Sequence, residues 1–159
     1  MFAAFLHLLL ALLWFLLAGG DSLVSLAFGL AVGFAIIALA EPLLGGSRYA
    51  SRVCAFLRWL WKVTVAFVQS NWQTIRIILR PPGTPLQAIF LRYDVRGLSL
   101  AETVLLAQVI TLTPGTTSVE LNPERTELLL HVLDGADPAA VIAGIDRDLR
   151  QPMLAFTRP

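Results

Sequence analysis

The 159-residue sequence has few charged residues and a single cysteine. Only 14% of its residues are Asp, Glu, Lys or Arg, whereas about 25% is usual for a soluble domain. Cys54 alone cannot form a disulfide framework or a cluster of thiolate metal ligands. The scarcity is greatest in residues 1–40, where Asp21 is the one charged side chain. These absences argue against a soluble enzyme, a disordered chain and a nucleic-acid-binding protein, and they indicate an integral membrane protein.

The net charge of +1 conceals an uneven distribution. Residues 1–80 sum to +4, whereas residues 81–159 sum to −3. We therefore expect a cationic membrane part followed by a more acidic folded part. The expected organisation is a transmembrane helical hairpin over 1–45, a membrane-associated helix with a proline-rich joint over 46–83, and a small cytoplasmic α/β domain over 84–159.

Two long apolar stretches predict the hairpin. A helix needs about 20 residues to cross the hydrocarbon core; Ser22–Ala40 meets that length, and Phe2–Leu17 is slightly short. The Gly19-Gly20-Asp21 link is too tight for any connection except that of a helical hairpin. A signal peptide is the competing interpretation of the first stretch, but the stretch lacks a basic start and a second apolar run follows closely.

The second stretch carries small residues at intervals of four: Ser25, Gly29 and Gly33. In lipid, such residues allow close approach of another helix, so we predict a packing face. Its partner is either the first helix or a different protein. Glu41-Pro42 then ends the helix, and Gly45-Gly46-Ser47 is expected to form a loop.

Residues 53–80 have a different pattern, with polar side chains on one stripe of a helix. At about 100° per residue, with the first of them at zero, all six fall between about 0° and 60°: Arg58, Lys62, Gln69, Gln73, Arg76 and Arg80. Two arrangements satisfy this pattern. The segment is either an interfacial helix with its basic face toward lipid headgroups, or a spanning helix whose stripe faces partner subunits.

The position of basic residues around this segment favours the interfacial arrangement. Arg48 and Arg52 precede it, and Arg92 and Arg96 follow it. Basic residues close to membrane segments belong on the cytoplasmic side. A crossing helix would carry one of these groups outside, whereas an interfacial helix keeps the N-terminus and the C-terminal domain in the cytoplasm.

The C-terminal half begins after a rigid proline-rich joint over residues 81–85. Leu86–Val95 is typical of a strand, and Ser99 with Glu102 forms a capping box for a helix that runs to about Leu112. At about 13 residues this helix is too short to cross a bilayer. We expect a buried core helix, with a fourth membrane segment as the alternative.

The remaining pattern completes a small α/β domain. Thr113-Pro114-Gly115-Thr116 ends the helix, and the strands Thr117–Leu121 and Thr126–Leu133 follow, joined by a turn at 122–125. Asp137-Pro138 begins a helix to about Arg150, and Met153–Thr157 is a candidate last strand. The order β-α-β-β-α predicts a ferredoxin-like split βαβ fold, complete with that last strand or incomplete without it.

The sequence contains no convincing catalytic constellation, and we expect no enzyme activity, no cofactor and no metal site. His7 and His131 lie far apart without metal-ligand neighbours. We expect His131 to be structural within its strand and His7 to lie close to the headgroups. Asp146 and Asp148 are interpreted as a solvated helix face. Neither apolar stretch carries a mid-helix Asp, Glu or Lys, so the chain is not expected to conduct ions alone.

The Leu-Thr-Pro-Gly-Thr run at 112–116, followed by a strand pair ending His131-Val132-Leu133-Asp134, resembles the E-type subunit of the multisubunit sodium/proton antiporters. These are the bacterial Mrp-type complexes, also called Mnh or Pha. The resemblance extends to the apolar N-terminal stretch with Trp14, the glycine-spaced second helix and the basic third segment. It implies no catalytic residues. The turn at Thr113, Pro114, Gly115 and Thr116 is a signature of unassigned role.

The resemblance implies a non-catalytic accessory subunit of a bacterial inner-membrane complex that exchanges Na⁺ for protons. Its partners would be the other antiporter subunits and the lipid bilayer, with no nucleic acid. Two alternatives remain: the same role in a K⁺/proton antiporter, and a membrane-tethered regulatory domain that binds a small molecule.

Overall fold

The computed structural model describes residues 2–20, 22–43, 48–81 and 85–158. Asp21, the predicted loop Gly45-Gly46-Ser47 and residues 82–84 of the predicted joint lie outside these ranges. The chain forms two compact units, which divide between Cys54 and Ala55. Each unit is described separately.

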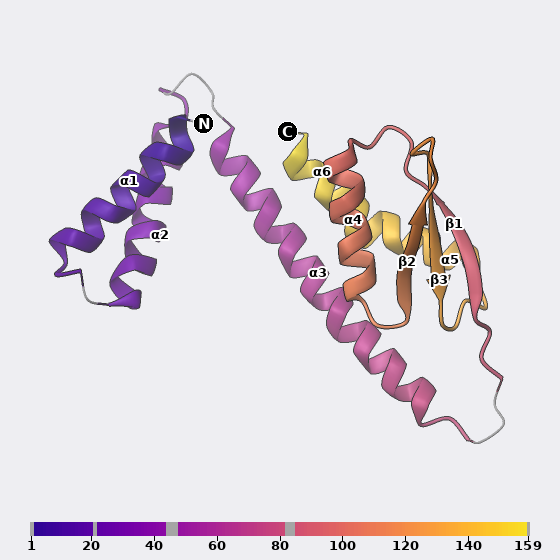
Figure 1. Cartoon of the computed structure of the whole chain (residues 1–159). Coiled ribbons are helices and arrows are strands. Elements are labelled where there is room, and N and C mark those ends of the chain that lie inside the picture. The colour runs from indigo at the N-terminus through magenta and orange to yellow at the C-terminus, as the bar shows by residue number, and fades with distance from the viewer. Residues whose placement is uncertain (1, 21, 44–47, 82–84, 159) are drawn as a thin grey trace. The chain divides into compact units, whose positions relative to one another are not determined.

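The first unit contains a helical hairpin of α1 (Phe2–Leu17) and α2 (Leu23–Ala40) (Figure 1). Gly19 and Gly20 have φ values of 99° and 69°, a left-handed conformation that side chains disfavour and that ends α1. Ser22 caps α2 by accepting a hydrogen bond from the Val24 amide at 3.2 Å. Among the described helices, α2 alone is long and apolar enough to cross a membrane, and α1, with 16 residues, is shorter.

The long helix α3 (Tyr49–Ile78) begins in the first unit and continues into the second. Its first turn is bonded to the end of the hairpin, because the Ala50 amide donates to Glu41 Oε1 at 3.1 Å. From Ala55 onward α3 belongs to the same compact unit as the C-terminal sheet. The basic segment and the α/β part are therefore structurally continuous.

The second unit contains a three-stranded antiparallel sheet in the order β1-β3-β2. Its strands are β1 (Ile89–Asp94), β2 (Thr116–Leu121) and β3 (Glu127–Val132). Both outer strands pair antiparallel with β3, so β1 and β2, connected through α4 (Leu100–Leu112), run parallel to one another. This is the split β-α-β arrangement that the sequence pattern predicts.

Helices cover one face of this sheet (Figure 1). The alternate residues of β3 are buried, whereas their neighbours Leu129 and His131 are half-buried and Phe90 on β1 is exposed. The buried core draws on every layer, including α3: Trp59, Tyr93, Val95, Leu106, Val109, Ile110, Leu128, Leu130, Ile145, Leu149 and Met153. The apolar helix α4 is therefore a core helix, as its length predicts.

Two capping predictions are confirmed. The Ser99 side chain accepts from the Glu102 amide, and the Glu102 carboxylate accepts from the Ser99 amide at 2.7 Å, which completes the capping box. Asp137 accepts from two amides in the first turn of α5 (Pro138–Ile145). Both signals depend on residues three positions apart or fewer, so the local sequence is sufficient to specify them.

The predicted last strand at Met153–Thr157 is wrong. A π-helical turn, η1 (Asp146–Arg150), continues α5 directly into a further helix, α6 (Gln151–Thr157). Ile145, Leu149 and Met153 recur every four residues and are all buried, which is a helical period. The first strand also begins at Ile89, three residues later than predicted.

Candidate functional site

The predicted small-residue face of α2 lies against α1. A Cβ atom at Gly29 would come within 2.9 Å of the Ala11 carbonyl oxygen, and one at Gly33 within 3.0 Å of His7 Cδ2. No side chain fits at these distances without displacing the neighbouring helix. The face is thus occupied within the hairpin, and Ser25 Oγ is buried there with no hydrogen-bond partner among the described residues.

His7 joins three helices, a role that the sequence pattern did not reveal. The side chain is buried in the first unit, with Nε2 2.8 Å from the Leu30 carbonyl oxygen and Nδ1 2.7 Å from the Tyr49 hydroxyl. Because a carbonyl only accepts, Nε2 donates to Leu30, and the Nδ1 of a neutral ring accepts from Tyr49. Its partners lie 23 and 42 residues away, beyond the reach of any local pattern.

One face of α3 packs on the α/β part of the second unit. Trp59 is buried, and its ring centroid lies 5.1 Å from that of Phe156 on α6. Phe56 meets the same ring edge-on at 5.4 Å. Val63 and Ala66 continue this contact along the helix. The third segment therefore contributes to the hydrophobic core of the domain.

Two cations of the predicted stripe bind this chain's own domain. Lys62 Nζ donates to the Arg147 carbonyl oxygen at 3.2 Å and lies 3.8 Å from Asp148 Oδ1. At the other end of α3, Arg80 pairs with Asp134 at 2.5 Å. Arg147, and more weakly Lys62, lower the pKa of the Asp148 carboxyl. Neither an interfacial nor a spanning arrangement of the stripe predicts that these side chains contact the chain's own domain.

The middle of the stripe and the signature turn line one cavity. It has a volume of about 380 Å³, and its polar lining comes from α3, from the signature turn and from Asp134, Arg147 and Asp148. The side chains that converge there are mostly uncharged: Gln69, Gln73, Thr74, Thr113 and Thr116. Two groups that the sequence marked separately are thus brought together by the fold.

Arg58 and Arg76 lie outside this cavity. Both are exposed, and the Arg76 guanidinium lies over the ring of Trp72 at 5.4 Å from its centroid. The six stripe residues therefore divide into four on the domain side and two on the margin of the helix. The stripe therefore lies along the edge between the domain-facing surface of α3 and its exposed surface.

The signature turn has a clear local role. Gly115 has a φ of 92°, and its carbonyl oxygen accepts from the Leu133 amide at 2.8 Å. The Thr113 hydroxyl donates to the Ile110 carbonyl oxygen at 2.6 Å, which closes the end of α4. The turn thus joins the end of α4 to the end of β3, and its residues line the cavity.

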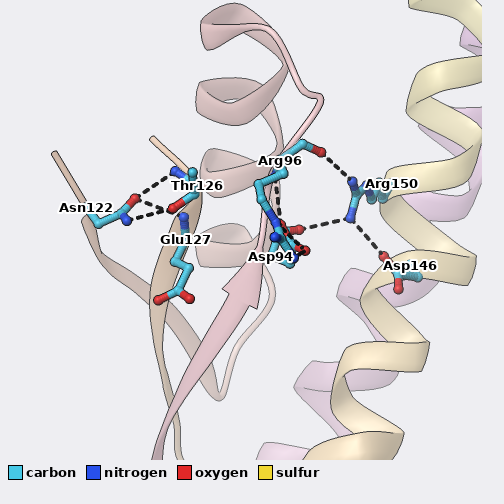
Figure 2. Close-up of polar contacts among 7 residues, drawn as sticks. All are labelled: Asp94, Arg96, Asn122, Thr126, Glu127, Asp146 and Arg150. Carbon is cyan, nitrogen blue, oxygen red and sulfur yellow. Dashed lines mark hydrogen bonds and ion pairs between the residues drawn. The ribbon is translucent and has the colours of Figure 1, made fainter. Parts of the chain in front are cut away.

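A polar cluster connects η1 to the end of the sheet that lies away from the signature turn (Figure 2). Arg150 donates to the carbonyl oxygens of Asp94 and Arg96 at 2.9 and 3.3 Å, and it lies 3.7 Å from Asp146. Arg96 is hydrogen-bonded to the Asp94 carboxylate, which lowers the pKa of Asp94 to about 2. Tyr93, whose pKa is raised mainly by burial, is hydrogen-bonded to Asp146.

This cluster corrects the interpretation of Asp146 as a solvated residue. Its carboxylate accepts from a tyrosine on β1, so it connects η1 to the sheet. At the neighbouring turn, Asn122 Oδ1 accepts from the amides of Thr126 and Glu127 at 2.8 and 2.9 Å (Figure 2). Both sets of contacts stabilise the fold of the domain. They leave α3 and the cavity as the surfaces with unassigned roles.

Within the described ranges, no group of three or more His, Cys, Asp and Glu side chains is arranged to hold a metal ion. The cavity is lined by amides and hydroxyls and by the charged side chains of Asp134, Arg147 and Asp148. Such groups can form hydrogen bonds to a polar ligand.

Comparison with known proteins identifies the family. The sequence profile of the family described as "Na+/H+ ion antiporter subunit" (MNHE) matches residues 7–156. The chain is 26% identical over 151 residues to the E1 subunit of the Na⁺/H⁺ antiporter of Staphylococcus haemolyticus (strain JCSC1435). That alignment covers 92% of this chain and 91% of the relative.

Two solved structures are also similar. A chain of the Mrp complex from Dietzia sp. DQ12-45-1b is 25% identical with a TM-score of 0.49, over 70% of this chain and 100% of that one. A chain of the membrane-bound sulfane sulfur reductase, an archaeal respiratory membrane complex, is 17% identical with a TM-score of 0.51, over 85% and 84% of the two chains, and it shows the fold alone. Because the profile match extends over nearly the whole sequence, the chain belongs to the MnhE family of Na⁺/H⁺ antiporter subunits.

Proposed function

We propose that the chain is a non-catalytic accessory subunit of a multisubunit Na⁺/proton antiporter in the bacterial cell membrane, where it contributes to Na⁺ export and pH homeostasis. The observation that carries this proposal is the similarity to the S. haemolyticus antiporter E1 subunit along more than nine-tenths of both chains. The hairpin anchors the protein, since α2 is long and apolar enough to cross the membrane. The domain then supplies surfaces for assembly.

We further propose that α3 does not cross the bilayer and that the N-terminus and the α/β domain are cytoplasmic. The domain contacts α3 from Phe56 onward and Arg80 just beyond the end of the helix. A spanning helix would place these contacts, including the Lys62 and Arg80 ion pairs, within the hydrocarbon. Ion pairs there are costly, so an arrangement along the cytoplasmic surface is favoured.

The cavity supports a second candidate function, that of a membrane-tethered regulatory domain. Its volume of about 380 Å³ is within the range of small-molecule sites, about 300–1,000 Å³. Gln69, Gln73 and Thr74 would provide hydrogen bonds to a polar ligand. Saturable binding of a metabolite to the full chain, lost in Gln73→Leu and retained in the control Gln108→Leu on α4, would support this function.

Copurification tests the principal proposal. A tagged chain solubilised from its native membrane in mild detergent is expected to bring down several larger hydrophobic partners, identified by mass spectrometry. Recovery of a lone, monodisperse chain would contradict the proposal. Antiport by membranes with and without the chain, measured separately with Na⁺ and K⁺, distinguishes the Na⁺/proton complex from a K⁺/proton complex.

A further inference from the structure

Helix α3 has a second, outward face opposite the one that packs on the domain. At about 100° per residue, with Arg58 at zero, the domain-facing Trp59, Val63 and Ala66 lie at about 80–140°. A row of large apolar side chains lies at about 260–320°, on the opposite side of the helix: Leu57, Trp61, Val68, Trp72 and Ile75, with Leu79 in the turn that follows the helix. Nothing else in the described part of the second unit covers this row. The exposed fractions are 69% for Trp61, 61% for Val68 and 76% for Leu79.

The charges around this face complement an anionic surface. Within Tyr49–Ile78 there are four basic side chains and no acidic one. Arg58 and Arg76 lie at about 0°, on the margin between the apolar row and the domain side. From this margin, their guanidinium groups can reach phosphates while the apolar row lies deeper. Tryptophans such as Trp61 and Trp72 are enriched at the boundary between headgroups and acyl chains.

The chain also brings α3 to the membrane surface. The hairpin ends at Ala40 and α3 begins at Tyr49; the eight intervening residues reach at most about 30 Å. The hydrogen bond from the Ala50 amide to Glu41 Oε1 holds the first turn still closer to the end of α2. An apolar helix face that follows a membrane span so closely along the chain has lipid within its reach.

We propose that the outward face of α3 inserts into the headgroup–acyl boundary of an anionic phospholipid leaflet. The domain lies on the opposite, aqueous side of the helix, and Arg58 and Arg76 contact the lipid phosphates. This inference rests on the proposed cytoplasmic topology and extends it. It reverses the orientation expected from the sequence, because the apolar face meets the lipid and part of the basic stripe meets the domain.

Depth measurements on the full chain in lipid vesicles test this insertion. In a Cys54→Ser background, a single spin-labelled cysteine is placed at Val68 or Ile75, and the matched control is placed at Ala143, an exposed position on α5. We expect accessibility to oxygen to exceed accessibility to a water-soluble nickel chelate several-fold at Val68 and Ile75. The reverse is expected at Ala143. The labels occupy exposed positions, so they leave the fold intact.

Lipid charge provides the second arm. In vesicles that contain phosphatidylglycerol, Arg58→Glu combined with Arg76→Glu should move the Val68 label toward water several-fold. The control pair Arg92→Glu on β1 with Arg125→Glu in the turn between β2 and β3, neither of them on α3, should leave the depth of the Val68 label unchanged. In purely zwitterionic vesicles the two pairs should differ little, because the electrostatic attraction is absent.

Three results would overturn the inference, and each differs from a failure of the proposed function. Equal water accessibility at Val68 and Ala143 would exclude insertion. Protection of Val68 only when copurified partners are present would assign the face to another subunit. A Val68 depth independent of phosphatidylglycerol would exclude the anionic lipid contact. The proposed function itself fails only in copurification, and the topology fails only if Ala143 is reached from outside intact cells.

Discussion

The hairpin and the α/β domain are both rich in apolar residues, but they use them in opposite ways. In α2, 17% of the 18-residue apolar window is buried within the structure. In β3, by contrast, Leu128, Leu130 and Val132 are almost completely buried. Apolar side chains stabilise the domain by leaving water, whereas most of those of α2 stay on its surface, where lipid would surround them in the proposed membrane anchor.

Different forces consequently stabilise each of the two regions internally. In lipid there is no hydrophobic gain from joining two helices, so the hairpin depends on close backbone approach at Gly29 and Gly33 and on the His7 hydrogen bonds. The domain depends on a packed core, helix caps and ion pairs such as Arg158 with Glu102. The same substitution should therefore have different consequences in the two regions.

The largest effect is expected from Gly29→Leu combined with Gly33→Leu. A Cβ alone would approach the Ala11 carbonyl oxygen to 2.9 Å and His7 to 3.0 Å, so leucine must force α1 away. We expect membrane insertion to persist, because α2 becomes more apolar, and copurification of partners to be abolished. The matched control is Ala27→Leu with Ala31→Leu, away from the glycine face of the same helix. Normal copurification by the glycine variant would show that this packing is dispensable.

Truncating one leucine in each region compares the effect of losing a buried apolar side chain with that of losing an exposed one. Leu130 is fully buried in β3, so Leu130→Ala should destabilise the domain by about 2–5 kcal/mol. Leu12→Ala, at a half-exposed site on α1, should change hairpin packing little. Hydrogen exchange of the full chain in detergent, followed over β1–β3 and over α1, measures both. Equal loss of protection in the two regions would remove the distinction between them.

The buried carboxylate of Glu102 gives the domain a pH dependence. Arg158 and the Ser99 amide lower its pKa well below the ordinary value of 4.5, although burial opposes this. Because the pKa of Glu102 is lower in the folded than in the unfolded chain, its ionised carboxylate stabilises the domain at pH values above the unfolded pKa. This stabilisation is lost as the pH falls through the folded pKa. Glu102→Gln should cost about 1.5–3 kcal/mol at neutral pH.

Denaturant unfolding of the wild type and Glu102→Gln across the acidic range checks this prediction. The difference between their free energies of unfolding should shrink as the pH falls below about 4.5. Glu124→Gln, at an exposed turn position, is the control and should follow the wild type closely. A constant difference at all pH values would mean that the carboxylate charge is not responsible.

The smallest effect is expected from Tyr49→Phe. The substitution removes the hydroxyl that binds His7 Nδ1 and leaves the ring contact in place. A loss of about 1 kcal/mol is expected for one such hydrogen bond. Amide exchange over residues 49–54 should accelerate accordingly. The control is Thr64→Val, because the Thr64 hydroxyl donates to the Leu60 carbonyl oxygen of its own helix. This substitution should leave amide exchange over residues 49–54 unchanged.

Some of the candidate site follows from the sequence. The periodicity of α3 identifies a polar stripe, and the Thr-Pro-Gly-Thr run identifies a helix end. Neither pattern shows that Gln69 and Gln73 line a cavity with Thr113 and Thr116, because about 40 residues separate the two groups. The contact of Asp146 with the sheet is hidden from the sequence for the same reason, since Tyr93 is 53 residues away.

The elements that sequence alone specifies are those whose causes are local. The capping box at Ser99 and the Asp137 cap depend on neighbours a few residues apart, whereas Leu128, Leu129 and Leu130 in β3 are alike in sequence and only the fold buries two of them. Tertiary structure decided which solvent each apolar face meets: α1 covers Gly29, the domain covers Trp59, and Val68 on the same helix remains uncovered. The physical reason is that burial depends on which distant surfaces meet, and a helical period records only that a face exists.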